Sequence, residues 1–138
     1  MKPGGARQKG QDGEREVIKL LKECCGESAE MKRNLAQTRE GGYDIVGFDW
    51  LAIEVKRQET LDVEAWWKQT LRQAGAEKIP VLIYRQNRKG WNVMMWGKIG
   101  EMESRVQVSM VSFKMWLLKE VERRSRMGQI LSASGLLT

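Results

Sequence analysis

The chain has 138 residues, carries a formal net charge of +6 with a pI near 9.5, and contains no histidine. The absence of histidine excludes Ser-His-Asp and Cys-His catalysis, histidine-ligated zinc hydrolases and nucleases that use a histidine general base. The length predicts a single domain, and the basic charge favours a polyanionic partner such as nucleic acid, with ordinary solubility charge as the alternative.

Signals for membranes, secretion and nucleotide cofactors are missing from the sequence. No run of eighteen apolar residues is present, and the basic N-terminus lacks the apolar segment that a secretory signal needs. The adjacent Cys24 and Cys25 cannot form an ordinary structural disulfide, which favours a reducing compartment. There is also no P-loop and no GxGxxG segment. We therefore expect a cytoplasmic protein that uses neither a membrane nor a nucleotide cofactor.

The N-terminal part divides into a basic arm and a helix. Residues 1–12 are rich in glycine and basic side chains, and we expect a flexible arm there. From Gly13 to Glu23 the apolar residues recur at helical spacing, with Asp12 as the N-cap. Glu14 lies on the buried stripe of this helix. It is either an acid stabilised by the helix dipole or a third acid of a functional site.

Strands and helices alternate along the rest of the chain. Of the adjacent Trp66 and Trp67, we expect one to pack and the other to lie at a dimer contact or against nucleic acid. Gly128 is expected to end the last helix, so that 13–127 form the domain and 128–138 a tail. The order indicates an α/β fold with a mixed central β-sheet and flanking helices. The expected strands are Glu30–Thr38, Tyr43–Phe48, Leu51–Val55, Pro80–Arg85, Trp91–Trp96 and Val106–Val111, and the expected later helices are Asp62–Ala76 and Ser112–Met127.

The predicted hairpin of residues 43–55 contains two carboxylates, and a lysine directly follows it. Asp44 and Glu54 lie equally far from Asp49, so a turn centred there places them opposite each other, with Cβ atoms about 5 Å apart. Lys56 shares a strand face with Glu54. A hard cation such as Mg²⁺ would compensate the two facing carboxylates, and this combination suits phosphodiester cleavage. The alternative is an amphipathic hairpin that exposes these charges.

Basic side chains near these elements are candidates for holding phosphates, because a guanidinium matches a phosphate with paired hydrogen bonds. The basic connector of residues 86–90 is either an exposed turn or a phosphate-contacting tip. The candidate DNA-binding residues are Lys9, Arg15, Arg33, Arg39, Arg85, Arg88 and Lys89.

Several segments resemble the PD-(D/E)xK nuclease superfamily, and within it the archaeal-type Holliday junction resolvases and their phage-encoded relatives. The similar segments are Lys9-Gly10 with Gly13-Glu14-Arg15-Glu16-Val17, then Asp44-Ile45-Val46, and Ile53-Glu54-Val55-Lys56. The resemblance runs from about residue 9 to about residue 85. The chain departs from the pattern at Tyr43, which stands in place of the proline of the motif, although many members also lack that proline. It departs again over 37–42, where the archaeal enzymes have a serine-containing loop.

The resemblance implies a restriction-endonuclease-like core and a Mg²⁺-dependent Holliday junction resolvase, with Mn²⁺ as a substitute, acting as a homodimer in the host cytoplasm. It implies that Asp44, Glu54 and the Val55 carbonyl bind the metal, and that Glu14 completes the site directly or through water. Lys56 would orient or deprotonate the attacking water, and Gln69 would position that water or a neighbouring backbone group. The alternatives are another endonuclease on this core (nicking, repair or branched-DNA trimming), a non-catalytic DNA-binding module, and an interaction protein with an incidental Glu-Val-Lys.

Overall fold

The computed structural model describes residues 5–25, 32–33 and 45–133, with side chains for 11–25, 45, 47–128 and 133. The elements follow in the predicted order: one helix, three strands, one helix, three strands and a last helix. None of the described helices is long and apolar enough to cross a membrane. The elements are α1 (Gly5–Cys25), β1 (Lys32–Arg33), β2 (Ile45–Val46), β3 (Leu51–Gln58), α3 (Val63–Ala74), β4 (Ile79–Gln86), β5 (Asn92–Ile99), β6 (Met102–Ser109) and α4 (Met110–Ala133).

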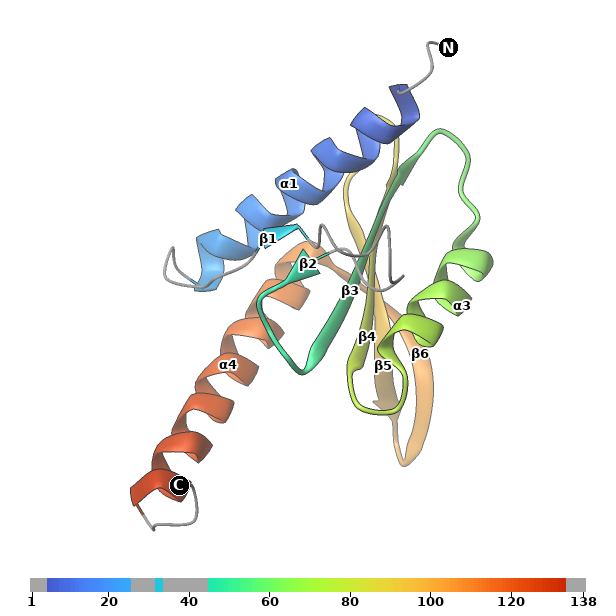
Figure 1. The fold of residues 1–138 in the computed structure, drawn as a ribbon. Helices are drawn as coiled ribbons and strands as arrows, with labels where there is room; N and C mark the ends of the chain where they lie inside the picture. The colour runs from blue at the N-terminus through green and yellow to red at the C-terminus, as the bar shows by residue number, and fades with distance from the viewer. Residues whose placement is uncertain (1–4, 26–31, 34–44, 134–138) are drawn as a thin grey trace.

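The strands form one mixed six-stranded sheet in the order β1-β2-β3-β4-β5-β6. β3 and β4 are parallel, and α3 is the crossover between them, whereas all the other neighbouring pairs are antiparallel. Figure 1 shows α3 on one side of the sheet and α1 with α4 on the other. The predicted α/β architecture with a mixed central sheet is confirmed.

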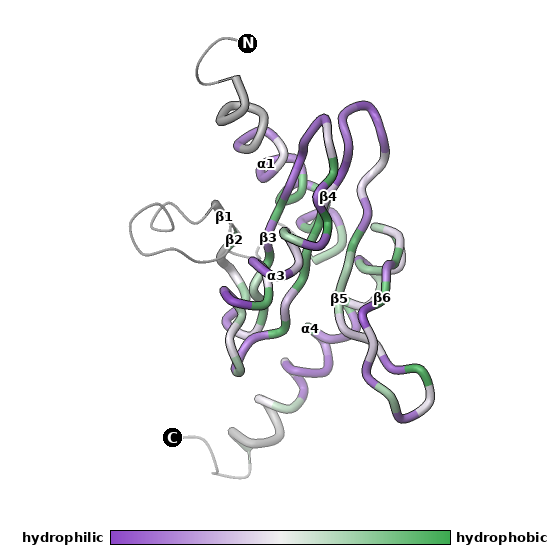
Figure 2. Tube along the Cα trace, turned by 90° about the vertical axis from the view of Figure 1, so that its right-hand side faces the viewer, coloured by the Kyte–Doolittle hydropathy of each residue, from purple (hydrophilic) through white to green (hydrophobic). Residues whose placement is uncertain are grey.

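Two apolar clusters lie on the two faces of the sheet. The larger one joins α1 and α4 to β3, β4 and β5, with Val17, Leu21 and Phe113 fully buried. The smaller one lies under α3, where Trp66 and Trp67 pack on Leu82 and other residues of β4 and β5. Figure 2 shows hydrophobic colour concentrated along the middle of the central strands and hydrophilic colour at their ends. β3 is therefore covered on both faces.

The first helix begins earlier than the sequence suggested. α1 starts at Gly5, eight residues before the expected start at Gly13, so residues 5–12 are helical rather than an arm. Asp12 does not cap this helix, because it lies inside it and its carboxylate accepts a hydrogen bond from Arg15 at 3.4 Å. A glycine inside a helix costs only about 1 kcal/mol relative to alanine, so the glycines of this segment do not forbid helix formation.

The C-terminal elements also differ from the prediction in their bounds. β6 is an eight-residue strand that ends at Ser109, and the Ser109 hydroxyl accepts a hydrogen bond from the Ser112 backbone N–H at 3.0 Å. This contact starts α4 at Met110 rather than at Ser112. The prediction that Gly128 ends the helix is wrong, because α4 continues through it to Ala133. Of the expected first strand, β1 covers two residues, and 34–38 lie outside the described residues.

Both tryptophans at the start of α3 are buried, so the expectation that one of them lies exposed is wrong. Trp66 and Trp67 are 8% and 4% exposed. The ring centroids of Trp66 and Tyr84 on β4 lie 6.1 Å apart, and those of Trp67 and Trp96 on β5 lie 5.4 Å apart. Two adjacent helical side chains point about 100° apart. Because α3 lies across two strands, it buries both tryptophan side chains. The prediction assumed that only one face of the helix is buried.

Candidate active site

The hairpin of β2 and β3 has the register that the sequence predicted. Ile45 pairs with Ile53, and these two positions lie equally far from Asp49. The Leu51 N–H donates to the Phe48 carbonyl at 3.2 Å, and this hydrogen bond closes a tight turn with Asp49 and Trp50 at its centre. Asp44 lies outside the described residues, so its place opposite Glu54 stays a prediction.

Glu54 and Lys56 share one face of β3, as predicted. Glu54 is only 3% exposed, and the Lys56 Nζ atom lies 3.5 Å from its Oε1 atom. Val55, between them, points to the opposite face and joins the cluster under α1 and α4. A carboxylate buried this deeply is costly unless charges and hydrogen bonds compensate it. The lysine ammonium is one such compensation.

Gln69 supplies a second contact to the same carboxylate oxygen. Its Nε2 atom donates to Glu54 Oε1 at 3.2 Å, from α3 across to β3. The structure therefore brings together three of the residues that the sequence selected as catalytic: Glu54, Lys56 and Gln69.

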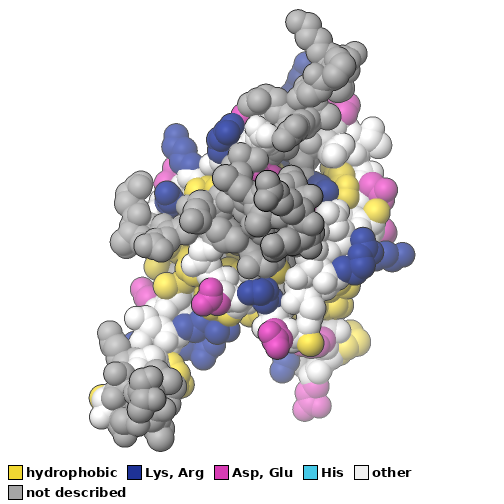
Figure 3. All heavy atoms as spheres, viewed as in Figure 1, with side chains coloured by type: hydrophobic (Ala, Val, Ile, Leu, Met, Phe, Trp, Pro, Cys, Tyr) yellow, Lys and Arg dark blue, Asp and Glu magenta, His cyan; other side chains and the backbone are white. Residues whose placement is uncertain are grey.

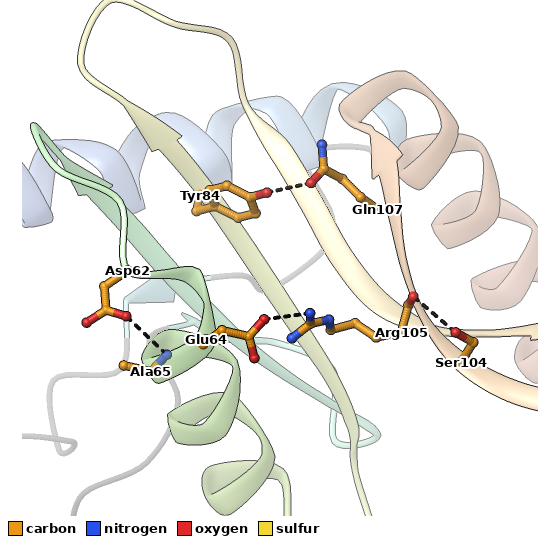
Figure 4. A network of polar contacts seen from close by, with 7 residues as sticks. All are labelled: Asp62, Glu64, Ala65, Tyr84, Ser104, Arg105 and Gln107. Carbon is orange, nitrogen blue, oxygen red and sulfur yellow. Dashed lines mark hydrogen bonds and ion pairs between the residues drawn. The ribbon is translucent and has the colours of Figure 1, made fainter.

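The position of α3 depends on contacts on its other flank, toward β6. Arg105 donates to Glu64 at 2.6 Å, and this hydrogen bond lowers the pKa of the Glu64 carboxyl. At the start of the helix, the Asp62 carboxylate accepts from the Ala65 N–H at 3.4 Å, which confirms the predicted cap. Burial raises the pKa of the Tyr84 hydroxyl beneath the helix. Figure 4 shows the Asp62 cap, the Glu64–Arg105 contact between α3 and β6, and the hydrogen bond that the Tyr84 hydroxyl on β4 donates to Gln107 on β6. α3 is thus held from both sides with Gln69 over Glu54.

Glu14 is buried on α1, as the helical pattern predicted. It is 7% exposed and follows Gly13, where an added Cβ would lie 3.5 Å from the Arg57 Cβ on β3. α1 therefore approaches β3 closely just before the acid. Whether Glu14 acts as a third acid of the site stays a prediction.

Glu16, which is half-buried on α1, contacts the sheet side of the fold and helps to fix the rotation of the helix about its axis. Its Oε1 atom accepts from Arg85 Nη1 at 3.2 Å and from Trp91 Nε1 at 3.0 Å. The Arg85 guanidinium also lies over the Trp91 ring, 5.0 Å from its centroid. Sequence patterns did not indicate this cluster, because Arg85 and Trp91 lie 69 and 75 residues from Glu16 along the chain.

The predicted phosphate-contacting residues fall into three groups. Arg15 is exposed on α1 beside Asp12, and Arg88 and Lys89 are exposed in the turn between β4 and β5. Arg85 is 17% exposed and is already engaged by Glu16, which suits an internal structural role. Lys9 and Arg33 belong to α1 and β1, but their side chains lie outside the described residues, as does the whole of Arg39.

The oxygen atoms at the site are suitable ligands for a cation that prefers oxygen. The Glu54 carboxylate and the Val55 carbonyl are oxygen ligands of the type that Mg²⁺ takes, and Glu54 is held in one orientation by two neighbours. Within the described ranges, no group of three or more His, Cys, Asp or Glu side chains is arranged to hold a metal ion. Asp44 falls outside those ranges, so the full ligand set stays a prediction.

Comparisons with known proteins identify the family and the fold of the chain. A family model described as "Phage putative PDDEXK endonuclease" matches residues 5–127. Among solved structures, the fold is similar to that of Hjc, a Holliday junction resolvase from Archaeoglobus fulgidus. The two chains are 18% identical with a TM-score of 0.50, and the match covers 77% of this chain and 95% of that chain. No curated protein sequence matches this chain. The chain therefore belongs to the phage PDDEXK endonuclease family, as a nuclease with an Hjc-like, restriction-endonuclease-like fold.

Proposed function

We propose that this chain is a Mg²⁺-dependent, structure-selective DNA endonuclease that makes symmetric paired cuts in four-way junctions as a homodimer. The buried Glu54, contacted by both Lys56 and Gln69, is the observation that carries the proposal. An ordinary amphipathic hairpin would expose such charges to water, where they need no partners. The likeness to Hjc supports the choice of a junction as the first substrate to test.

The metal would be held by Asp44, Glu54 and the Val55 carbonyl, with Glu14 completing the set directly or through water. When bound, Mg²⁺ supplies charge stabilisation to the phosphate and to the leaving 3′ oxygen. Mn²⁺ would substitute, because it takes the same kind of oxygen ligands.

The chain's own residues orient the reaction. Lys56 lies next to the Glu54 carboxylate and would orient the attacking water or help to remove its proton. Gln69 fixes Oε1 of Glu54, which keeps the carboxylate in one orientation. One site cuts one strand, so paired cuts in a two-fold symmetric junction require two copies of the chain.

The test is cleavage of a four-way junction, a linear duplex and a single strand, each with Mg²⁺, Mn²⁺ or EDTA. Wild type is compared with Asp44→Asn and Glu54→Gln. Glu103→Gln is the matched control, because it makes the same carboxylate-to-amide change at an exposed position on β6. We expect symmetric cuts in the junction alone, lost with EDTA and in both site variants but kept in the control.

Two other outcomes would contradict parts of the proposal. Equal cutting of duplex or single strands would keep the nuclease and remove the junction preference, in favour of a nicking or repair enzyme. Binding without metal-dependent cutting of any substrate would favour a DNA-binding module on the same fold.

A further inference from the structure

Two cations on the outer face of α3, Lys68 and Arg72, have no role in the site described so far. Both are exposed and lie four residues apart, so they are neighbours one turn apart on the same helix face. Gln69, next to Lys68, donates to Glu54 at 3.2 Å. The two cations therefore flank the residue that contacts the buried carboxylate.

In rotation about the helix axis, Arg72 lies nearer than Lys68 to the Gln69 side of α3. At about 100° per residue, Arg72 is rotated about 60° from Gln69 and lies roughly one turn further along α3, whereas Lys68 is rotated about 100° toward the solvent. The buried residues Trp66, Thr70 and Ala74 lie around the opposite side of the helix. Arg72 thus lies on the rim between the solvent face and the Glu54 side of α3.

The charges of Lys68 and Arg72 are not balanced by the nearby acids. Glu54 is paired with Lys56, and Glu64 forms its hydrogen bond with Arg105 at 2.6 Å. The Lys68 charge also lowers the pKa of the Glu64 carboxyl, but the hydrogen bond from Arg105 is the main cause of that shift. Within the described part of the chain, neither Lys68 nor Arg72 forms an ion pair. Figure 3, which has the same view as Figure 1, shows Lys and Arg side chains in dark blue on the right-hand side of the molecule, where α3 lies.

We propose that Arg72 and Lys68 bind successive backbone phosphates of the DNA strand that enters the site, next to the phosphate at Lys56. The proposal rests on the proposed nuclease function. A guanidinium binds a phosphate through two hydrogen bonds, whereas an ammonium binds it as a point charge. Charges on one strand recur every ~3.4 Å of helix axis, and two long side chains one helical turn apart can contact neighbouring phosphates. The contacts would set the register of the strand against Lys56.

The test measures the salt dependence of DNA binding, because each lost phosphate contact lowers the slope of log affinity against log salt by about 0.9 on duplex DNA. A labelled four-way junction and a labelled duplex are titrated with protein in EDTA, which prevents cleavage. The variants are Arg72→Gln, Lys68→Gln and the double variant. Lys119→Gln, an exposed lysine on α4, is the matched control. Thermal unfolding confirms that each variant is folded.

We expect the slope to fall by about 1 in each single variant and by about 2 in the double variant, with no change in the control. Arg72→Lys should keep the wild-type slope, because the charge remains, but should bind more weakly than wild type because the bidentate contact is lost. A purely structural role for Arg72 predicts no change in slope in any of these variants.

The outcomes separate this proposal from the proposed function. A double variant with the slope of wild type would overturn the phosphate contacts, even if wild type cuts junctions. A reduced slope in a protein that cuts no DNA would support the contacts and refute the nuclease activity. If wild type neither binds nor cuts DNA, both proposals fail.

Discussion

Removal of the Glu16 carboxylate tests whether this residue anchors α1 on the sheet. Glu16→Ala deletes two hydrogen bonds at once, from Arg85 at 3.2 Å and from Trp91 at 3.0 Å. It also leaves a guanidinium that is 17% exposed without its acidic partner. Arg85 belongs to β4 and Trp91 directly precedes β5, so the loss acts directly on the docking of the helix.

The expected loss of unfolding free energy is about 2 kcal/mol. A hydrogen bond between charged groups contributes about 1.5–3 kcal/mol, but Glu16 is 39% exposed, so solvent screening reduces the Arg85 contact to about 1 kcal/mol. The Trp91 contact adds about 1 kcal/mol, the ordinary value for one hydrogen bond. At roughly 4 °C per kcal/mol for a domain of this size, the melting temperature should fall by about 8 °C.

Glu23→Ala is the matched control, because it removes another acid of α1 that pairs with a cation of a distant element. The Glu23–Lys114 pair is 3.5 Å long, and Glu23 is 53% exposed. An exposed ion pair of this kind contributes about 0.5 kcal/mol, or about 2 °C. Both variants are compared with wild type by urea and thermal unfolding. Equal losses in the two variants would show that Glu16 is an ordinary surface acid and would refute this account of α1 docking.

Three further changes have clear expected results. Gly97→Ala should destabilise the protein by about 1–3 kcal/mol in urea unfolding, because an added Cβ would lie 2.9 Å from Val106 Cγ2, and an unchanged midpoint would contradict this contact. Gly128→Ala should stabilise it by about 0.5–1 kcal/mol, because the glycine is helical and no atom lies within 4 Å of an added Cβ; a loss would argue against a continuous α4. Burial and the hydrogen bond with Cys24 raise the pKa of the Cys25 thiol to about 12. Cys25 should therefore react slowly with iodoacetamide at pH 7.5 and faster as the pH rises. Fragment-ion mass spectrometry can locate the label, and rapid labelling of Cys25 itself at pH 7.5 would contradict the raised pKa.

The hairpin was predictable because its information is local. The turn at Asp49 and the alternation of side chains along a strand were enough to place Glu54 and Lys56 on one face. The pairing of Ile45 with Ile53 confirms the centre of the turn. Gln69 entered through the resemblance, and in the structure it donates to Glu54; its role in positioning the water or a backbone group stays a prediction.

The features that the sequence could not provide depend on residues far apart in the chain. Nothing near Glu16 indicates that Arg85 and Trp91 approach it, so the anchor of α1 was not predicted. The burial of both Trp66 and Trp67 depends on how α3 lies across two strands. By contrast, Lys68 and Arg72 stand as a basic pair beside Gln69 in the sequence itself, although the predicted phosphate-contacting residues did not include them.

The contact between α3 and β3 and the contacts that dock α1 differ greatly in sequence separation. Glu54 and Gln69 are 15 residues apart within one strand–helix–strand unit, whereas the contacts that dock α1 span 69 and 75 residues. The short loop costs less entropy to close, and cooperative units of a native protein often coincide with such motifs. Backbone amides of β3 and β4 should therefore exchange with deuterium more slowly than those of α1. Transient opening of α1 would move Glu14 away from β3 while Glu54, Lys56 and Gln69 stay together.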